Sequence, residues 1–229
     1  MGRWDDGAAG APDGADDLGA ARTRDGYDAV AADYAARFAD ELAAKPLDRA
    51  LLGAFAELVR GRGPVADVGC GPGHVARALH ERGLPVVGLD LAPAMVAAAR
   101  RLHPDLPFQV GSMLALPVED GAWGGIVAFY SIIHLPPRAV PQALAEFHRA
   151  LRPGGRMLLA FHLGDETRHL DEWWGRPVDL DFHFFAIDDM ARWLAEAGFA
   201  VEARVEREPY APTEVATRRG YLLARKPGD

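Results

Sequence analysis

The sequence predicts an α/β fold in which a largely parallel β-sheet is covered by helices on both faces. Segments with strand character alternate with segments of helical periodicity, and most of the strand segments are almost entirely apolar. Both features are typical of parallel strands buried on both faces of a sheet. The last two strand segments, 200–208 and 220–226, have no helix between them, so we expect an antiparallel hairpin at one end of the sheet.

The composition is that of a globular domain. The 229 residues, 49% hydrophobic and 25% charged, are enough to bury such a sheet in a single domain. We find no apolar stretch long enough to span a bilayer, no secretion signal and a single cysteine, Cys70, so we expect a cytoplasmic protein with no membrane partner. A net charge of −8 without a basic patch argues against nucleic acid as a partner.

The N-terminal third divides into a tail and two helices. Residues 1–26 are rich in Gly, Asp and Ala and lack periodicity, so we expect a flexible tail. Helical spacing of apolar residues begins at Tyr27, and this helix is expected to end before Pro46, whose ring blocks continuation. A second helix follows and ends at the glycines near residue 62.

The remaining elements are predicted in alternation. Strands are expected at 64–69, 84–90, 107–111, 125–131 and 156–162, and helices at 74–83, 93–103 and 137–155. Residues 163–185 look irregular with one alternating piece. A helix over 186–199 follows, with Asp188 and Asp189 in its first turn, where the helix dipole favours negative charge.

The stretch "VADVGCGPGH" (65–74) places three glycines between the first strand and its helix. Such a turn lets a ligand approach the backbone closely. A nucleoside triphosphate loop needs a Lys and a Ser or Thr after the last glycine, and neither is present. A dinucleotide loop needs a third glycine for close packing at the position of His74. The spacing therefore argues against both phosphate-binding loops.

With these residues the sequence resembles the class I S-adenosylmethionine-dependent methyltransferases of the small-molecule type. The matching segments, in order, are "VADVGCGPGH", "VVGLD", "GSMLALP", "GIVAFYSIIHL" and "ALRPGGRMLLAFH". The resemblance covers roughly residues 27–226. It implies S-adenosylmethionine as cofactor and a Rossmann-like three-layer sandwich with sheet order 3-2-1-4-5-7-6 and an antiparallel seventh strand. It also implies a single methyltransferase domain, 27–229, with lid helices at 27–62.

The resemblance implies roles for several residues around the cofactor. Asp67 meets the ammonium group of the methionine tail directly or through water, and Asp90 accepts hydrogen bonds from both ribose hydroxyls. Leu91 and Met95 enclose the adenine. Ser112 stands where the family usually has an acid, which predicts weaker recognition of the adenine amino group. Further cofactor contacts are expected from Tyr27, Gly69, Cys70, Gly71, Gly73, Met113, Phe129 and Tyr130.

Two histidines are candidates for a catalytic role. Methyl transfer is an in-line displacement that needs a base only when the acceptor must lose a proton. His134 follows the fourth strand and His162 ends the fifth, at the edge where open α/β sheets bind ligands. The alternative is that His134 only packs at a loop-to-helix junction. Tyr27 is the first choice, and Tyr34 the second, for a lid tyrosine over the cofactor; both also suit the core face of a helix.

The segment 162–185 is the most distinctive part of the chain. Its alternating apolar residues suit a flap over the acceptor, for which Trp173, Trp174, His183 and Phe185, together with Tyr34, are the candidate contacts. A homodimer contact or additional core is the competing interpretation. A metal site from His162, His169 and His183 fits no standard spacing, so we expect none.

The leading hypothesis is methyl transfer from S-adenosylmethionine to a small molecule, such as a natural product or another secondary metabolite. One alternative retains the bound cofactor but catalyses a cyclisation or rearrangement without methylation. Another is an NAD-dependent oxidoreductase, against which His74 argues.

Overall fold

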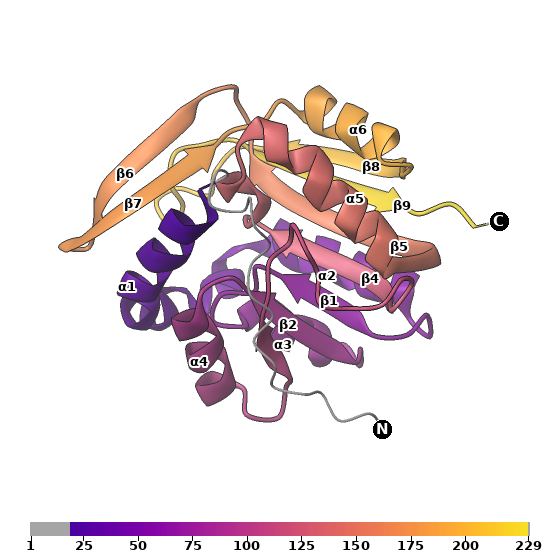
Figure 1. Cartoon of the computed structure of the whole chain (residues 1–229), viewed down its shortest axis with the longest axis horizontal. Helices are drawn as coiled ribbons and strands as arrows, with labels where there is room; N and C mark the ends of the chain where they lie inside the picture. Colours follow the sequence, from indigo (N-terminus) through magenta and orange to yellow (C-terminus); the bar gives the residue numbers. More distant parts are fainter. Residues whose placement is uncertain (1–18, 229) are drawn as a thin grey trace.

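A seven-stranded sheet forms the centre of the molecule (Figure 1). The structure, a computed structural model, describes residues 19–228. The strands are β1 (Val65–Val68), β2 (Val86–Asp90), β3 (Phe108–Val110), β4 (Trp123–Phe129), β5 (Leu151–His162), β8 (Ala200–Arg207) and β9 (Arg219–Arg225). Their order is β3-β2-β1-β4-β5-β9-β8. The strands β3, β2, β1, β4 and β5 run parallel to one another, and β9 runs antiparallel to both β5 and β8. The predicted fold class is confirmed.

The last two strands are eighth and ninth in the chain, not sixth and seventh, because a separate hairpin precedes them. Strands β6 (Thr167–Trp173) and β7 (Arg176–His183) pair with each other and form no part of the main sheet. The expectation of irregular structure over 163–185 was therefore wrong for most of this segment. Its alternating residues belong to a two-stranded ribbon that projects beside the sheet (Figure 1).

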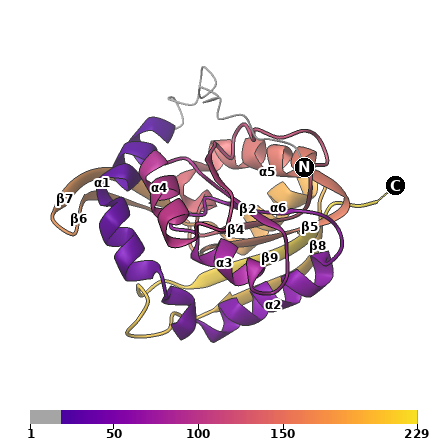
Figure 2. The same ribbon diagram turned by 90° about the horizontal axis from the view of Figure 1, so that it is seen from below.

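Helices cover both faces of the sheet (Figure 2). One face packs against α2 (Pro46–Val59), α3 (His74–His80) and α4 (Pro93–Leu102), and the other against α5 (Val140–Ala150) and α6 (Ile187–Glu196). Short 3-10 turns are η2 (Glu41–Ala44), η3 (Ile132–His134) and η4 (Pro137–Ala139). Because both faces are covered, the central strands are buried almost throughout, as their apolar sequences predicted.

The first helix begins earlier than its sequence pattern indicated. Helix α1 spans Ala20–Phe38, so residues 20–26 are helical and not part of a flexible tail; residues 1–18 lie outside the described part of the chain. Tertiary contact explains the difference. Gly26 is buried, and a Cβ atom there would lie 2.8 Å from Leu180 Cδ2 of β7. This glycine thus lets α1 approach the hairpin.

Helix α1 also packs against α4, so it lies between α4 and β7 near the carboxyl ends of the parallel strands (Figures 1 and 2). A second boundary differs too: the helix expected over 137–155 ends at Ala150. Leu151 instead pairs with Trp123 and extends β5. Within residues 19–228, no helix has both the length and the apolar character that a membrane span requires.

Candidate active site

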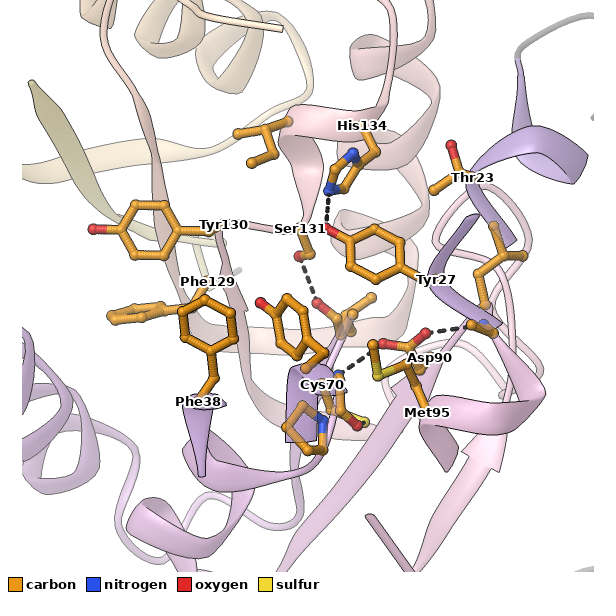
Figure 3. Close-up of a pocket in the computed structure, with 18 of the residues that line it drawn as sticks. Thr23, Tyr27, Phe38, Cys70, Asp90, Met95, Phe129, Tyr130, Ser131 and His134 are labelled. Carbon is orange, nitrogen blue, oxygen red and sulfur yellow. Dashed lines mark hydrogen bonds between the residues drawn. The ribbon is translucent and has the colours of Figure 1, made fainter. Parts of the chain in front are cut away.

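A cavity of about 610 Å³ opens at the carboxyl ends of β1, β2, β4 and β5. This volume lies within the ~300–1,000 Å³ typical of small-molecule sites. Its walls come from α1, the loop after β1, the ends of β2 and β4, turn η3, the hairpin and the segment before β9 (Figure 3). The cavity therefore lies where the sequence placed the ligand, and α1 and the hairpin cover it.

The glycine loop after β1 has a conformation that other residues would strain. Gly69, Gly71 and Gly73 have φ values of 74°, 50° and 85°. At Gly69 space is also short, since a Cβ atom would lie 2.2 Å from Ser131 Cβ. The Ser131 hydroxyl donates to the Val68 carbonyl over 2.7 Å and holds the two strand ends together. The glycines thus allow a tight turn whose backbone faces the cavity.

Asp90, at the end of β2, has a fixed orientation toward this loop. Its Oδ2 accepts the Gly71 N–H over 2.7 Å, and its Oδ1 accepts the Ala92 N–H over 2.9 Å (Figure 3). Burial raises the pKa of Asp90 to about 6, although these two N–H groups oppose the rise. Each carboxylate oxygen keeps a further lone pair, so Asp90 can accept two hydroxyl groups from a ligand in the cavity.

Most of the predicted cofactor residues line the cavity. They are Tyr27, Gly69, Cys70, Gly71, Asp90, Leu91, Met95, Ser112, Met113, Phe129 and Tyr130. Ser112 Oγ accepts the Leu114 N–H over 3.2 Å, which orients the hydroxyl within its own turn. Cys70 is buried, and burial raises the pKa of its thiol well above the usual value. Its environment is that of a packed residue and not of a nucleophile.

Asp67 and Gly73 are not part of the cavity wall, contrary to expectation. Asp67 is 1% exposed, and its Oδ2 accepts the Ala76 N–H of α3 over 2.9 Å. Burial raises the pKa of this carboxyl to about 7. Side chains along a β-strand alternate between the two faces of the sheet, and Asp67 points toward α3 and away from the cavity. Asp67 fixes α3 to the loop and does not contact the cavity.

His134 and Tyr27 point toward each other across the cavity (Figure 3). His134 Nδ1 lies 3.0 Å from the Asp181 carbonyl oxygen, which only accepts, so Nδ1 carries the ring proton. Nε2 therefore accepts the Tyr27 hydroxyl, 2.7 Å away. Burial lowers the pKa of His134 to about 4. The imidazole is neutral at pH 7, and its one lone pair is occupied by the tyrosine of α1.

His162 lies further along the same edge of the sheet. Its Nδ1 is 2.9 Å from the Thr217 hydroxyl, and its ring stacks on Phe184. Burial, followed by the positive charge of Arg219, lowers the pKa of His162 to about 3. The Tyr130 ring also lines the cavity, but its hydroxyl points away from His134 and contacts the Tyr221 hydroxyl at 2.8 Å (Figure 3).

The flap residues divide into two groups. Trp173 and Phe182 line the cavity, as does Tyr34 of α1. Trp174, His183 and Phe185, which were expected there, do not. Trp174 packs outside against Phe38. His183 contacts the Thr167 hydroxyl across the hairpin, and Phe185 is buried in the core. The hairpin thus presents only one side to the cavity.

One end of the cavity is more polar than the sequence indicated. Glu41, Lys45, His74, Glu214 and Arg219 all contribute to the wall there. Glu41 accepts from Lys45 Nζ at 2.6 Å and lies 2.7 Å from His74 Nε2. Burial alone would raise the pKa of Glu41, but the hydrogen bonds to His74 and Lys45 lower it to about 2. These residues come from separate parts of the chain, and of them only His74 belongs to a motif identified in the sequence. Within the described range, no cluster of His, Cys, Asp and Glu side chains is arranged to hold a metal ion.

Known proteins match both the sequence and the fold. The sequence model described as "Methyltransferase domain" matches residues 65–155. Malonyl-[acyl-carrier protein] O-methyltransferase of Serratia marcescens is 34% identical over 117 residues, which are 51% of this chain and 45% of that protein. This chain spans about half or less of the length of the curated relatives it matches.

Two solved structures show the fold. A methyltransferase from Methanosarcina mazei has a TM-score of 0.66 and 16% identity, and the match covers 72% of this chain and 93% of that one. The glycopeptide N-methyltransferase MtfA, solved with S-adenosylmethionine, has a TM-score of 0.61 and 21% identity, covering 79% and 87% of the two chains.

The fold and site define a Rossmann-like protein with a cavity at the carboxyl ends of the parallel strands. Within that class, residues 65–155 match the methyltransferase domain, and the sequence is similar to those of S-adenosylmethionine-dependent methyltransferases.

Proposed function

We propose that this protein binds S-adenosylmethionine in the cavity and transfers its methyl group to a small-molecule acceptor. The observation that carries the proposal is the Asp90 carboxylate. The glycine loop and the start of α4 orient it at the cavity wall, where it can accept both hydroxyls of a ribose. The match to the methyltransferase domain and the S-adenosylmethionine complex of MtfA support the choice of ligand.

The chain's own residues suit each part of this cofactor. S-adenosylmethionine, when bound, supplies a methyl group on a positively charged sulfur, which is a good leaving group. Leu91 and Met95 offer apolar surface to the adenine beside Asp90. The methionine tail would lie along the glycine loop, where Gly69 and Gly71 line the cavity and Tyr34 lies close to Gly71. These positions follow one another along the cavity wall.

The acceptor would occupy the part of the cavity between the hairpin and the end of β4. Trp173 and Phe182 provide an apolar wall there, and α1 covers it with Tyr27. Such a closed, apolar site excludes water and holds the acceptor in line with the methyl group. Positioning of this kind accounts for large accelerations in intramolecular reactions.

We infer that positioning contributes more than a strong general base. His134 and His162 have pKa values of about 4 and about 3, so each is neutral but weakly basic at pH 7. His134 Nε2 is also already bonded to Tyr27. A proton leaving an acceptor hydroxyl would have two ways to reach His134. It would pass through the Tyr27 hydroxyl, or that hydroxyl would first have to be displaced.

Two measurements test the proposed function. Calorimetry with S-adenosylhomocysteine and with NADH compares the two cofactor classes, and we expect binding of the former alone. Incubation with S-adenosylmethionine and a panel of phenols, amines and carboxylic acids should then give a product heavier by one methylene unit, together with S-adenosylhomocysteine. Tight NADH binding without S-adenosylhomocysteine binding would overturn the proposal. An isomeric product without S-adenosylhomocysteine would favour the non-methylating alternative.

A further inference from the structure

Arg219 is a buried cation in the cavity wall. It is the first residue of β9 and pairs in register with His162 of β5, so it lies beside the candidate acceptor site. It is only 4% exposed. A charged side chain is rarely buried to this extent unless it is paired, because removal from water is costly.

The hydrogen-bond partners of Arg219 are all neutral. Nη1 donates to the carbonyl and the hydroxyl of Thr217, and Nη2 donates to the Val215 carbonyl over 3.2 Å. Throughout residues 19–228, no carboxylate lies within ion-pairing distance of this guanidinium. A guanidinium has five N–H groups, and these contacts account for three. Arg219 therefore retains donors and makes no direct ion pair, although its charge contributes to the lowered pKa of Glu214.

The neighbouring cations are paired, which distinguishes them from Arg219. Lys45 contacts Glu41 at 2.6 Å and Glu214 at 3.6 Å. Arg207 contacts both oxygens of Glu214, at 2.6 and 2.8 Å. Glu214, which also lines the cavity, is thus already engaged by another arginine. Because both Glu214 oxygens are bonded by Arg207, the free N–H groups of Arg219 are available to a group that enters the cavity.

The surroundings of Arg219 are suited to an organic acid. Its Cζ lies 5.7 Å from the centre of the Tyr130 ring. The rings of Tyr130 and His162 are 5.4 Å apart, and Phe184 stacks on the other side of His162. An aromatic or apolar body can pack against these rings while its anionic end meets the guanidinium, which is shaped to bind carboxylates through two N–H groups.

We propose that Arg219 binds the carboxylate of the methyl acceptor, and that the protein selects acidic small molecules. This inference rests on the proposed function, since it assigns the acceptor side of the same cavity. In the sheet, β9 is three strands away from β1, or about 14 Å at the usual strand spacing. The anchored carboxylate is therefore that of the acceptor, and the methionine tail of the cofactor lies at the glycine loop.

The test compares acids with their uncharged amides in the protein saturated with S-adenosylhomocysteine. The probes are benzoate, phenylacetate and 3-phenylpropionate, each paired with its primary amide, and affinities are measured by calorimetry or ligand-observed NMR. We expect at least one acid to bind about tenfold more tightly than its amide, since a charge-assisted hydrogen bond is lost in the amide. If every acid binds no better than its amide, the inference is wrong.

Three variants assign this preference to Arg219. In Arg219→Met the preference should fall to within twofold, and in Arg219→Lys part of it should remain. Arg218→Gln is the matched control, because Arg218 is exposed and pairs with Glu206 and Glu208 outside the cavity. A purely structural role of Arg219 in the turn at 215–217 would lower the melting temperature but leave the ratio of acid to amide affinity unchanged, and that result would overturn the inference.

The affinity for S-adenosylhomocysteine separates this inference from the proposed function. We expect it to be the same in Arg219→Met as in the wild-type protein. A loss of that affinity in Arg219→Met would mean that Arg219 holds the cofactor's carboxylate, which contradicts the assignment to the acceptor. If the wild-type protein does not bind S-adenosylhomocysteine at all, the proposed function fails first.

Discussion

Replacement of Asp90 by asparagine should separate cofactor binding from stability. The substitution keeps the shape of the side chain and removes its charge. An amide offers one oxygen and one NH2 group, whereas Asp90 accepts an N–H on each oxygen, from Gly71 and from Ala92. Whichever way the amide turns, its NH2 group faces one backbone N–H. Asp90→Asn therefore cannot satisfy both N–H groups and also accept two ribose hydroxyls.

The expected change in stability is small because two effects oppose each other. Burial raises the pKa of Asp90 from 3.8 to about 6, which corresponds to a cost of about 3 kcal/mol for the ionised form at neutral pH. Neutralising the side chain removes this cost. Leaving one backbone N–H without an acceptor costs about 1–3 kcal/mol. The free energy of unfolding at pH 7 should thus rise by between zero and about 2 kcal/mol.

The expected change in binding is much larger. A hydrogen bond to a charged group contributes about 1.5–3 kcal/mol, and the amide loses at least one such bond to the ribose. The Kd for S-adenosylhomocysteine, measured by calorimetry, should rise by roughly 10- to 150-fold. Asp28→Asn is the control: Asp28 Oδ1 accepts the Ala94 N–H over 2.7 Å, and its side chain is not part of the cavity wall. An Asp90→Asn protein that binds within twofold of the wild type would refute the placement of the ribose.

Three further predictions concern the same end of the sheet. The affinity for S-adenosylhomocysteine should fall by about tenfold per pH unit below pH ~6, because Asp90, with its pKa raised to about 6, must be ionised to accept the hydroxyls. Calorimetry from pH 5 to 8 measures this change, and an affinity that does not depend on pH would contradict it. Gly69→Ala should destabilise the protein by at least about 2 kcal/mol more than Gly61→Ala in denaturant unfolding: both glycines have φ of 74°, but only Gly69 meets a neighbour. Nitrogen NMR at pH 7 should find the ring proton of His134 on Nδ1, and a proton on Nε2 would refute the assigned contacts. Tyr27→Phe should raise the pKa of His134 from about 4, because the neutral imidazole loses the hydroxyl that donates to it.

The regular elements of the central sheet could be predicted because local signals agree there. Apolar runs, proline at helix starts and glycine at helix ends placed each strand and most helices within a few residues. Two misplaced elements show where local signals fail. Residues 20–26 were assigned to a tail because the segment lacks hydrophobic periodicity, yet Gly26 within it allows the close approach to Leu180. The segment of the hairpin was expected to be irregular, because its two strands pair only with each other and this pairing forms when the chain folds.

Most residues predicted for the cofactor side line the cavity, and the exceptions are Asp67 and Gly73. Asp90 and the glycines belong to one strand–loop–helix unit, so their spacing reflects their geometry. Asp67 belongs to the same unit but points away from the cavity, because one residue of register in a strand reverses the face that a side chain occupies.

The sequence by itself determined the fold class, the resemblance to methyltransferases and the end of the sheet at which the cavity lies, since these depend on hydrophobic periodicity and short motifs. Only the tertiary structure decided what faces the acceptor. It placed Tyr27 on His134 across 107 residues of chain, brought one side of the hairpin over the cavity, and left Arg219 buried without a direct ion pair. These contacts join residues that are distant in sequence, and no local pattern encodes which side chains will meet or which charge will remain unpaired.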